Sequence, residues 1–280
     1  MNTELDFKEY HLQYIASGGF ASIYSALPKQ PGTPHLTLKI LRQSLLQKQA
    51  QLDRFEEELS ILKSLQHSSL PELVHYGSVD ELPYLAYKHI KGRTVLALLQ
   101  KGHGSGGSIL QIAIDVMTQL LETLDYLHNM SDPIVHSDVS PENLIIDQHA
   151  RLFLIDFGCA RILDSGQQGM AKWIGKPSYL SPEQAQGLNW DHRSDLFQAG
   201  IVFYELLTRR KKNSGKTERL ARTIAANPPQ PNLDSIPASL NNFITKLLSI
   251  EPALRWQSAS ECISELGKIG ANNKFLSINS

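Results

Sequence analysis

The period of the hydrophobic pattern changes about a third of the way along the 280-residue chain, and this change restricts the fold more than any other feature. Before Gly92, residues 48–66 place apolar side chains three and four apart, which predicts one helix. The other apolar segments there are short and bounded by turn residues, which predicts strands. They read YHLQYIAS, FASIYSAL, HLTLKIL, LVHYGSV and LPYLAYK. Together these patterns predict an α+β chain that begins with a small sheet carrying one helix.

After Gly92 the helical period dominates. The Gly- and Ser-rich residues 102–108 are expected to be a connector, and an apolar stripe over 109–127 predicts a long buried helix. The segments NLIID and RLFLID, on either side of QHA, predict a hairpin. Further helices are expected from Asp195 onward, over 237–249 and over 258–268.

These patterns divide the chain into two lobes. We expect a strand-rich N-lobe over residues 1–87, a hinge over 88–90, a mostly helical C-lobe over 91–268 and a tail over 269–280. A single domain would then cover about residues 10–268.

Composition excludes several classes of partner. The 27 basic and 28 acidic side chains leave a formal net charge of -1, so no sequence-wide field favours nucleic acid or an anionic membrane. The apolar run at residues 199–204 is too short to span a bilayer, and the polar N-terminus does not resemble a signal peptide. The two cysteines suit a reducing compartment. We therefore expect a cytoplasmic protein, with export as an effector left open. The basic run at residues 209–212 is interpreted as a solvated turn.

Two short motifs carry the chemistry. The segment HSDVSPEN at residues 136–143 matches the spacing of a phosphotransferase catalytic loop, and IDFG follows it at residues 155–158. Three fixed positions match by chance about once in 8,000 starts, so two such motifs in order are not accidental. Asp138 can orient and deprotonate an accepting hydroxyl, while Asn143 and Asp156 can supply oxygen ligands to Mg²⁺, or to Mn²⁺ in its place.

With these motifs in order, residues 10–268 resemble a bacterial-type, eukaryotic-like serine/threonine protein kinase. The resemblance implies a two-lobed fold, ATP as phosphoryl donor and protein substrates of unspecified identity. The segment IASGGFASIY is similar to the family's Gly-rich loop, although Ala16 and Ala21 stand where two glycines are usual. This loop contributes the first nucleotide-binding candidates: Ile15, Ala16, Ser17, Gly18, Gly19, Phe20, Ala21 and Ile23.

The same resemblance assigns the remaining candidates. Lys39 in LTLK is the expected cation for the α- and β-phosphates, and Glu58 is its expected partner. Glu56 and Glu57 compete for that role, but only Glu58 has the family's spacing to the apolar residues that follow. Candidate adenine contacts, including the position known as the gatekeeper and one in the hinge, are Tyr87, His89 and Ile145.

Three further positions resemble the structural anchors of the family. Glu183 in SPE and Arg255 in EPALRW are expected to pair, and Asp195 is expected to order the catalytic-loop backbone. The histidines are interpreted as packing residues, His136 as part of the scaffold, and Cys159 as a small residue in a tight site.

The catalytic loop departs from the family at two cations. Ser137 stands where an Arg is usual, so we expect activity without phosphorylation of the activation segment. Ser140 stands where a Lys is usual, and Lys176 stands where a Thr is usual in the segment GKPSY. The two departures are reciprocal, and we expect Lys176 to supply the missing charge beside Asp138 with Ser140 as its partner.

Two alternatives remain at this level. A small-molecule phosphotransferase resembling aminoglycoside kinases shares the H-x-D-x-x-x-x-N logic and lacks the Arg, but it also lacks the D-F-G glycine and the S-P-E segment. A non-catalytic pseudokinase would fit the altered Gly-rich loop, but such proteins usually lose at least one of the catalytic side chains that this chain retains.

Overall fold

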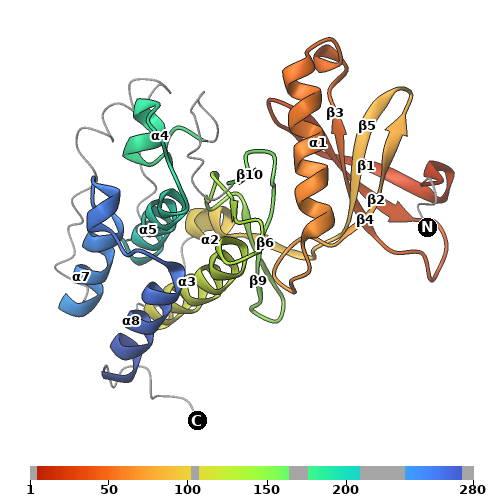
Figure 1. Ribbon diagram of the computed structural model, residues 1–280. Helices are drawn as coiled ribbons and strands as arrows, with labels where there is room; N and C mark the ends of the chain where they lie inside the picture. The colour runs from red at the N-terminus through yellow and green to blue at the C-terminus, as the bar shows by residue number, and fades with distance from the viewer. Residues whose placement is uncertain (1–4, 102–106, 164–175, 209–236, 273–280) are drawn as a thin grey trace. The chain divides into compact units, whose positions relative to one another are not determined.

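The computed structural model describes residues 5–101, 107–163, 176–208 and 237–272 (Figure 1). The chain forms two compact units. The N-terminal unit comprises Met1–Gly92 together with the short segment Ile155–Gly158, and the C-terminal unit comprises Arg93–Leu154 and Cys159–Ser280. The pattern of strands first and helices afterwards, and with it the α+β class, is confirmed.

The N-terminal unit is built on a five-stranded antiparallel sheet with the strand order β1-β2-β3-β5-β4. All five expected strands are present: β1 Tyr10–Ser17, β2 Ala21–Pro28, β3 Leu36–Leu41, β4 Leu73–Val79 and β5 Leu82–Lys88. Two residues, Asp80 and Glu81, join β4 to β5, and both have positive φ angles of 48° and 65°. Type I′ hairpin turns require this geometry because its twist matches that of the flanking strands.

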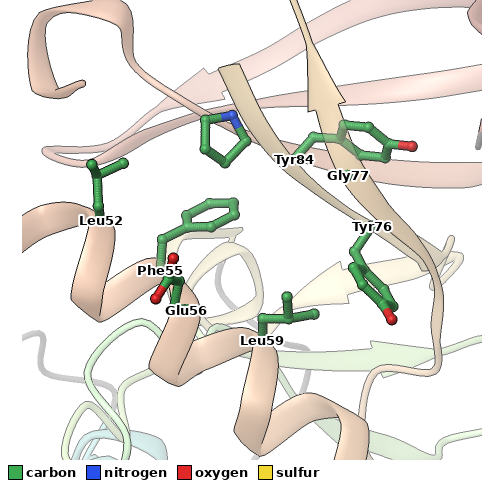
Figure 2. Close-up of a pocket in the computed structure, with 8 residues that line it drawn as sticks. Leu52, Phe55, Glu56, Leu59, Tyr76, Gly77 and Tyr84 are labelled. Atoms are coloured by element: carbon green, nitrogen blue, oxygen red, sulfur yellow. The ribbon is translucent and has the colours of Figure 1, made fainter. Parts of the chain in front are cut away.

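One helix, α1 (Gln49–Ser64), packs beside this sheet (Figure 1). Figure 2 shows Leu52, Phe55 and Leu59 of α1 beside the sheet at Tyr76, around a small cavity of about 180 Å³ that Gly77 and Tyr84 also line. Glu58 is buried on the same helix. The three- and four-residue spacing of the apolar side chains thus fixes which way α1 turns its single buried carboxylate.

The N-terminal segment closes the other side of the sheet's core. Asp6 caps the N-terminus of the 3₁₀ helix η1 (Phe7–Glu9), and its carboxylate accepts a hydrogen bond from the Lys8 amide. Phe7 meets the Tyr84 ring edge-on at 5.1 Å, and both join a core with Leu36, Leu38 and Ala86. A second 3₁₀ turn, η2 (Gln43–Leu45), follows β3.

The C-terminal unit is mainly helical (Figure 1). Its helices within the described ranges are α2 Val95–Lys101, α3 Gly107–His128, α4 Pro182–Gln186, α5 Arg193–Thr208, α7 Ala238–Leu247 and α8 Ala259–Asn272, with the 3₁₀ turn η3 Pro252–Leu254. The long helix α3 contacts both α5 and α8. At Gly200 an added Cβ would lie 2.9 Å from the Leu247 Cβ, so glycine permits α5 and α7 to approach closely.

Short strands in this unit frame the catalytic loop. The strands are β6 Gly92–Thr94, β7 Ile134–Val135, β8 Leu144–Asp147, β9 Leu152–Leu154 and β10 Arg161–Ile162. The hairpin expected from NLIID and RLFLID is β8 paired with β9, and β6 adds to it on the β8 side. Residues 136–143 connect β7 to β8, so both ends of the loop are fixed by strand pairing.

Several boundaries differ from the sequence expectation. The helix α3 begins at Gly107, so the last two residues of the expected connector are helical, and α2 was not anticipated. The last helix continues to Asn272 instead of ending at 268. Three expected features lie outside the described residues: the basic run at 209–212, the break in the helical pattern at PPQPNL (residues 228–233) and most of the tail. Among the helices that the structure describes, none has the length and apolar character needed to cross a membrane.

Candidate active site

The catalytic loop is held through its backbone by side chains of α5. The Asp195 carboxylate accepts hydrogen bonds from the backbone N–H groups of His136 and Ser137, both at 2.8 Å. The Gln198 side chain accepts from the Val139 N–H at 2.8 Å and donates to the Ser137 carbonyl at 2.9 Å. Ser137 has a φ of 66°, a left-handed conformation that costs about 1–3 kcal/mol in a non-glycine residue unless its surroundings enforce it. These four buried hydrogen bonds enforce it here.

Asp138 follows directly and is 5% exposed. Its Oδ2 accepts from Asn143 Nδ2 at 2.7 Å, and the same amide nitrogen donates to the Asp138 carbonyl at 2.8 Å. Its Oδ1 accepts from the backbone N–H of Lys176 at 2.9 Å. These two donors fix the direction of the carboxylate, which keeps acceptor capacity for a substrate hydroxyl.

Lys176 lies at the start of the segment that leads into α4, and its ammonium contacts the same loop. Nζ lies 3.1 Å from Asp138 Oδ2, 2.9 Å from Ser140 Oγ and 3.0 Å from Asn143 Oδ1. The structure therefore brings together the four candidates that the sequence assigned to this unit's chemistry. Ile145, a candidate adenine contact, lies on β8 and is partly exposed.

A second group of candidates lies within the N-terminal unit. Lys39 on β3 contacts both Glu58 oxygens at 2.7 and 2.8 Å and Asp156 Oδ1 at 2.7 Å. Burial alone lowers the pKa of Lys39, but the Asp156 and Glu58 carboxylates outweigh burial and raise that pKa well above its usual value. Lys39 therefore carries a full positive charge at neutral pH. Glu58, and not Glu56 or Glu57, is its helical partner.

Tyr87 adds a neutral donor to this group. Its hydroxyl donates to Glu58 Oε1 at 3.4 Å. Burial and the nearby Glu58 charge raise the pKa of Tyr87 well above its usual value, so the phenol remains protonated. The residue at the gatekeeper position thus supports the buried Lys39–Glu58 pair.

Gly158 permits this charged group to be compact. An added Cβ would lie 3.1 Å from Lys39 Nζ and 3.3 Å from Asp156 Oδ1, so a side chain here would have to displace these charged groups by a few tenths of an ångström. Asp156 itself has a φ of 67°, so the D-F-G segment is bent where it meets Lys39. The Asp156 side chain is 48% exposed although one of its oxygens holds Lys39.

Each unit offers one oxygen ligand of the kind that a hard divalent cation prefers. Asp156 has a carboxylate in the N-terminal unit, and Asn143 has an amide oxygen in the C-terminal unit. Mg²⁺ is commonly held by one or two such groups together with substrate phosphates. Within the described residues, His, Cys, Asp and Glu form no cluster of three or more that could hold a metal ion alone. Either group is therefore better suited to a cation that arrives with nucleotide phosphates than to a cation held by protein ligands alone.

The Gly-rich loop connects β1 to β2, and several of its side chains are exposed. Within its backbone the Gly18 N–H donates a hydrogen bond of 2.9 Å to the Ala21 carbonyl. An added Cβ at Gly19 would meet no atom within 4 Å. Ile15 and Phe20 are 51% and 43% exposed, so two of the apolar nucleotide-binding candidates present their side chains to solvent.

The end of β5 carries an arrangement that the sequence did not reveal. The rings of His35 and His89 stack with centroids 3.8 Å apart and an interplanar angle of 22°. Thr37 Oγ1 lies 2.9 Å from His89 Nδ1, and Ser25 Oγ lies 2.7 Å from His35 Nε2. Burial lowers the pKa of both imidazoles, and the neighbouring His35 lowers that of His89 further. The two residues are 54 positions apart, and no periodic pattern connects them.

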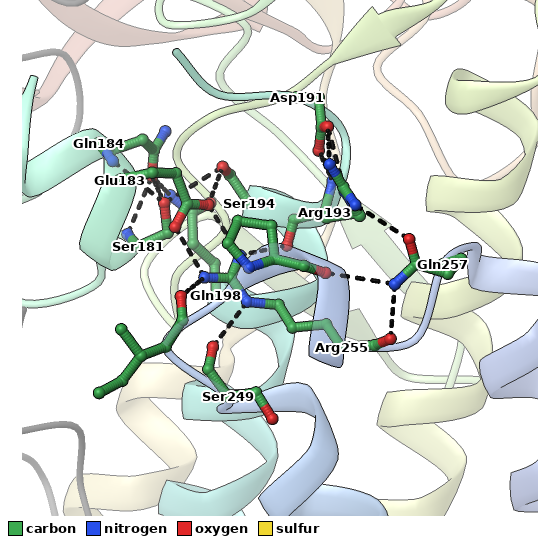
Figure 3. Close-up of polar contacts among 12 residues, drawn as sticks. Ser181, Glu183, Gln184, Asp191, Arg193, Ser194, Gln198, Ser249, Arg255 and Gln257 are labelled. Carbon is green, nitrogen blue, oxygen red and sulfur yellow. Dashed lines mark hydrogen bonds and ion pairs between the residues drawn. The ribbon is translucent and has the colours of Figure 1, made fainter. Parts of the chain in front are cut away.

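A buried ion pair anchors the segment that carries Lys176 (Figure 3). Arg255 donates from Nη1 and Nη2 to the two Glu183 oxygens, each at 2.7 Å. Burial by itself raises the pKa of the Glu183 carboxyl, but the hydrogen bonds and charge of Arg255 hold it below its usual value. Ser181 caps α4 in a capping box with Gln184, so this end of the segment is fixed twice.

Polar side chains on α5 complete the anchor. The buried Tyr179 hydroxyl donates to Glu205 Oε2 at 2.9 Å. Gln198 and Glu205 were missed as functional candidates from the sequence. Their signal was present, since both are polar residues inside the otherwise apolar stretch LFQAGIVFYELL.

Comparison with known proteins is consistent with this geometry. Residues 10–265 match the model of the protein kinase domain. A probable serine/threonine-protein kinase PknB of Bifidobacterium longum is 32% identical over 281 residues, which cover 93% of this chain and 39% of the relative. A probable serine/threonine-protein kinase of Clostridium perfringens is 28% identical over 92% of this chain and 38% of its own length. The serine/threonine-protein kinase PrkC of Bacillus subtilis is 28% identical over 91% and 39%.

The chain thus spans about two-fifths of the length of the curated relatives it matches. The similarity covers the units described above, and it leaves the remaining parts of those longer relatives without a counterpart in the alignment.

Proposed function

Because this chain belongs to the protein kinase family, we propose that it transfers the γ-phosphoryl group of ATP to serine or threonine hydroxyls of protein substrates. The observation that carries the proposal is the buried Asp138 carboxylate, oriented by Asn143 and by the Lys176 amide on a loop clamped by Asp195. The named similarity to serine/threonine-protein kinases over about nine-tenths of the chain supports the choice of acceptor.

Asp138 is the proposed catalytic base. It accepts the proton of the substrate hydroxyl while the hydroxyl oxygen forms a bond to the γ-phosphorus, and the bond from that phosphorus to the β–γ bridging oxygen breaks. The products are the phosphorylated substrate, ADP and a proton on Asp138 that passes to solvent. Asn143 maintains the direction of the Asp138 carboxylate through its 2.7 Å hydrogen bond.

Nucleotide and metal are assigned to the matching groups. Lys39, held by Glu58, is proposed to hold the α- and β-phosphates, and Asp156 with Asn143 to hold Mg²⁺ or Mn²⁺. The bound cation would neutralise charge on the phosphate oxygens. The further nucleotide contacts proposed are Ile15, Ala16, Ser17, Gly18, Gly19, Phe20, Ala21, Ile23, Tyr87, His89 and Ile145.

The kinase assignment is tested by incorporation of labelled phosphate from ATP into a generic basic protein, with a panel of aminoglycosides and sugars as competing acceptors. We expect protein phosphorylation in the wild type and a loss of several orders of magnitude in Asp138→Asn and in Lys39→Met. Asp115→Asn, an exposed carboxylate on α3, is the matched control and should retain full activity. Near-normal turnover in Asp138→Asn would refute the role of the base.

The same assay separates the alternatives. Transfer to a small molecule with no protein phosphorylation would identify a small-molecule phosphotransferase. ATP binding by calorimetry without transfer to any acceptor would identify a pseudokinase. The match of the family model over residues 10–265 and the Glu183–Arg255 anchor both favour the protein kinase.

We also propose the cytoplasm as the site of action. Both cysteines are free thiols, Cys262 fully buried and Cys159 partly exposed, which suits a reducing compartment. Cell fractionation with detection of the endogenous chain tests this location.

A further inference from the structure

We infer that Lys176, in the activation segment between Cys159 and Glu183, supplies the cation that acts on the transferred phosphoryl group. We infer also that Ser140 of the catalytic loop is the hydrogen-bond partner that positions this ammonium. This inference rests on the proposed phosphoryl transfer. It moves a catalytic charge out of the loop 136–143 and into a segment 33 residues further along the chain from Asn143.

The loop itself has the wrong charge for the reaction. HSDVSPEN contains two carboxylates, Asp138 and Glu142, and neither Lys nor Arg. Phosphoryl transfer spreads negative charge over the phosphate oxygens, and catalysis depends on fixed positive groups close to that charge. A loop with a formal charge of minus two would oppose the reaction unless a cation from elsewhere entered it.

Lys176 enters it with complete hydrogen bonding. An ammonium group has three donors, and here they have three acceptors within 3.1 Å, on Asp138, Ser140 and Asn143. The Glu142 carboxylate is further away, at 3.8 Å. The Lys176 side chain is 35% exposed whereas the Asp138 side chain is 7% exposed, so Lys176 is the more accessible member of the pair. Its ammonium, 3.1 Å from Asp138 Oδ2, would lie close to a phosphate oxygen that approaches Asp138.

Ser140 is complementary to this arrangement. It is fully buried, and its hydroxyl accepts from Lys176 Nζ at 2.9 Å. A lysine at position 140 would bring a second ammonium to the same acceptors, and two like charges there would repel. The small hydroxyl gives room for Lys176 and a hydrogen-bond partner to it. The serine at position 140 and the lysine at position 176 therefore complement each other: the hydroxyl and the ammonium have exchanged chain positions.

The segment holds Lys176 by contacts that need no modification. The Tyr179 N–H donates to the Lys176 carbonyl at 2.9 Å, and the Tyr179 hydroxyl is fastened to Glu205. Lys176 is thereby held by the buried Tyr179–Glu205 hydrogen bond, three residues further along the chain.

A purely structural role for Lys176 makes a different prediction. Its backbone N–H holds Asp138 Oδ1, and that contact persists in any non-proline substitution. Lys176→Thr thus removes the ammonium and leaves the hydrogen bond from the backbone N–H of residue 176 to Asp138. If the ammonium only steadied the loop, a lysine placed at position 140 would have no reason to restore the rate.

The test is a double-mutant cycle with the purified chain, MgATP and a protein substrate that the wild type phosphorylates. We expect Lys176→Thr to lower kcat by roughly 10²–10³ with a much smaller change in the KM for ATP. Lys176→Thr combined with Ser140→Lys should recover at least tenfold of that loss, although each single substitution lowers kcat. Lys268→Thr, an exposed lysine on α8, is the matched control and should leave kcat unchanged.

The outcomes separate this inference from the proposed function. An inactive wild type, or a fully active Asp138→Asn, would overturn the kinase assignment itself. An active wild type with a dead Asp138→Asn, but with full kcat in Lys176→Thr or no gain in the double variant, would overturn only the exchange. Thermal unfolding of every variant is measured alongside, and a double variant that recovers kcat supports the exchange even if its melting temperature is lower.

Discussion

The buried Glu183–Arg255 pair offers a quantitative test of how the C-terminal unit holds its activation segment. Arg255 is 1% exposed, and each of its five N–H donors has an acceptor. Two go to Glu183, and the others go to the carbonyls of Arg193, Ile250 and Ser249. Glu183→Ala removes the counter-charge and leaves a buried guanidinium with two lost partners. Breaking a buried pair in this way costs about 3–5 kcal/mol.

The expected change is large enough to measure by two methods. For a unit of this size about 1 kcal/mol shifts the melting temperature by roughly 2–4 °C, so Glu183→Ala should lower it by roughly 6–20 °C. Urea unfolding followed by tryptophan fluorescence gives the free energy independently, since Trp190 and Trp256 lie in this unit. Glu265→Ala removes the exposed partner of Lys268 and should cost less than about 0.5 kcal/mol.

Replacement of both partners distinguishes a lost attraction from an unpaired charge. Glu183→Leu with Arg255→Met removes both charges at similar volume, and such replacements are often neutral or stabilising. We expect the double variant to be more stable than Glu183→Ala. An unfolding free energy within 1 kcal/mol of wild type for Glu183→Ala, or a double variant less stable than the single one, would refute the reasoning. Because the folded-state pKa of Glu183 is depressed, its contribution is present above the unfolded pKa near 4.5 and is lost as pH falls through the folded value.

Three further outcomes are expected. Gly158→Ala forces the Lys39 ammonium aside and should lower kcat/KM for ATP by roughly tenfold, whereas Gly267→Ala, where an added Cβ meets no atom within 4 Å, should retain full activity. Because the pKa values of His35 and His89 are depressed, folding stability should decline as pH falls below about 6.5, and His35→Gln with His89→Gln should flatten that decline in melting curves. Complete dephosphorylation of the protein, verified by mass spectrometry, should leave the rate of phosphoryl transfer unchanged. An inactive product would contradict the prediction, made from Ser137, that activity needs no phosphorylation of the activation segment.

Local patterns were sufficient for the five strands of the N-terminal sheet and for the long helices, and the family resemblance supplied most of the site. The strand segments were readable because each is short, rich in β-branched or aromatic residues and bounded by turn residues, and the helix α1 because Leu52, Phe55 and Leu59 share its 3.6-residue period. The choice of Glu58 over its two acidic neighbours came from the resemblance, because only Glu58 has the family's spacing to the residues that follow it. Contacts within one motif are encoded by spacing.

Contacts between distant polar residues were not encoded in this way. The His35–His89 stack joins the start of β3 to the end of β5, and it depends on strand pairing that brings the His89 N–H to the His35 carbonyl at 2.9 Å. Neither histidine interrupts a hydrophobic pattern, so no local pattern indicates that the two rings are in contact. Gln198 does interrupt one, and a buried amide inside an apolar helix implies a polar partner. Its partner is the catalytic-loop backbone.

The two missing cations of the loop have one physical explanation. In a loop with an Arg before the catalytic Asp, that guanidinium is available to receive a phosphate from the activation segment. Here Ser137 is fully buried, and its hydroxyl has no hydrogen-bond partner among the described residues. A kinase without that receptor needs another means of fixing the segment, and the Glu183–Arg255 and Tyr179–Glu205 contacts provide one. Where this segment is anchored, at Tyr179 and Glu183, it can also hold an ammonium in place for catalysis. On the proposal above, loss of the receptor and transfer of the cation to Lys176 both follow from the burial that anchors residues 176–183.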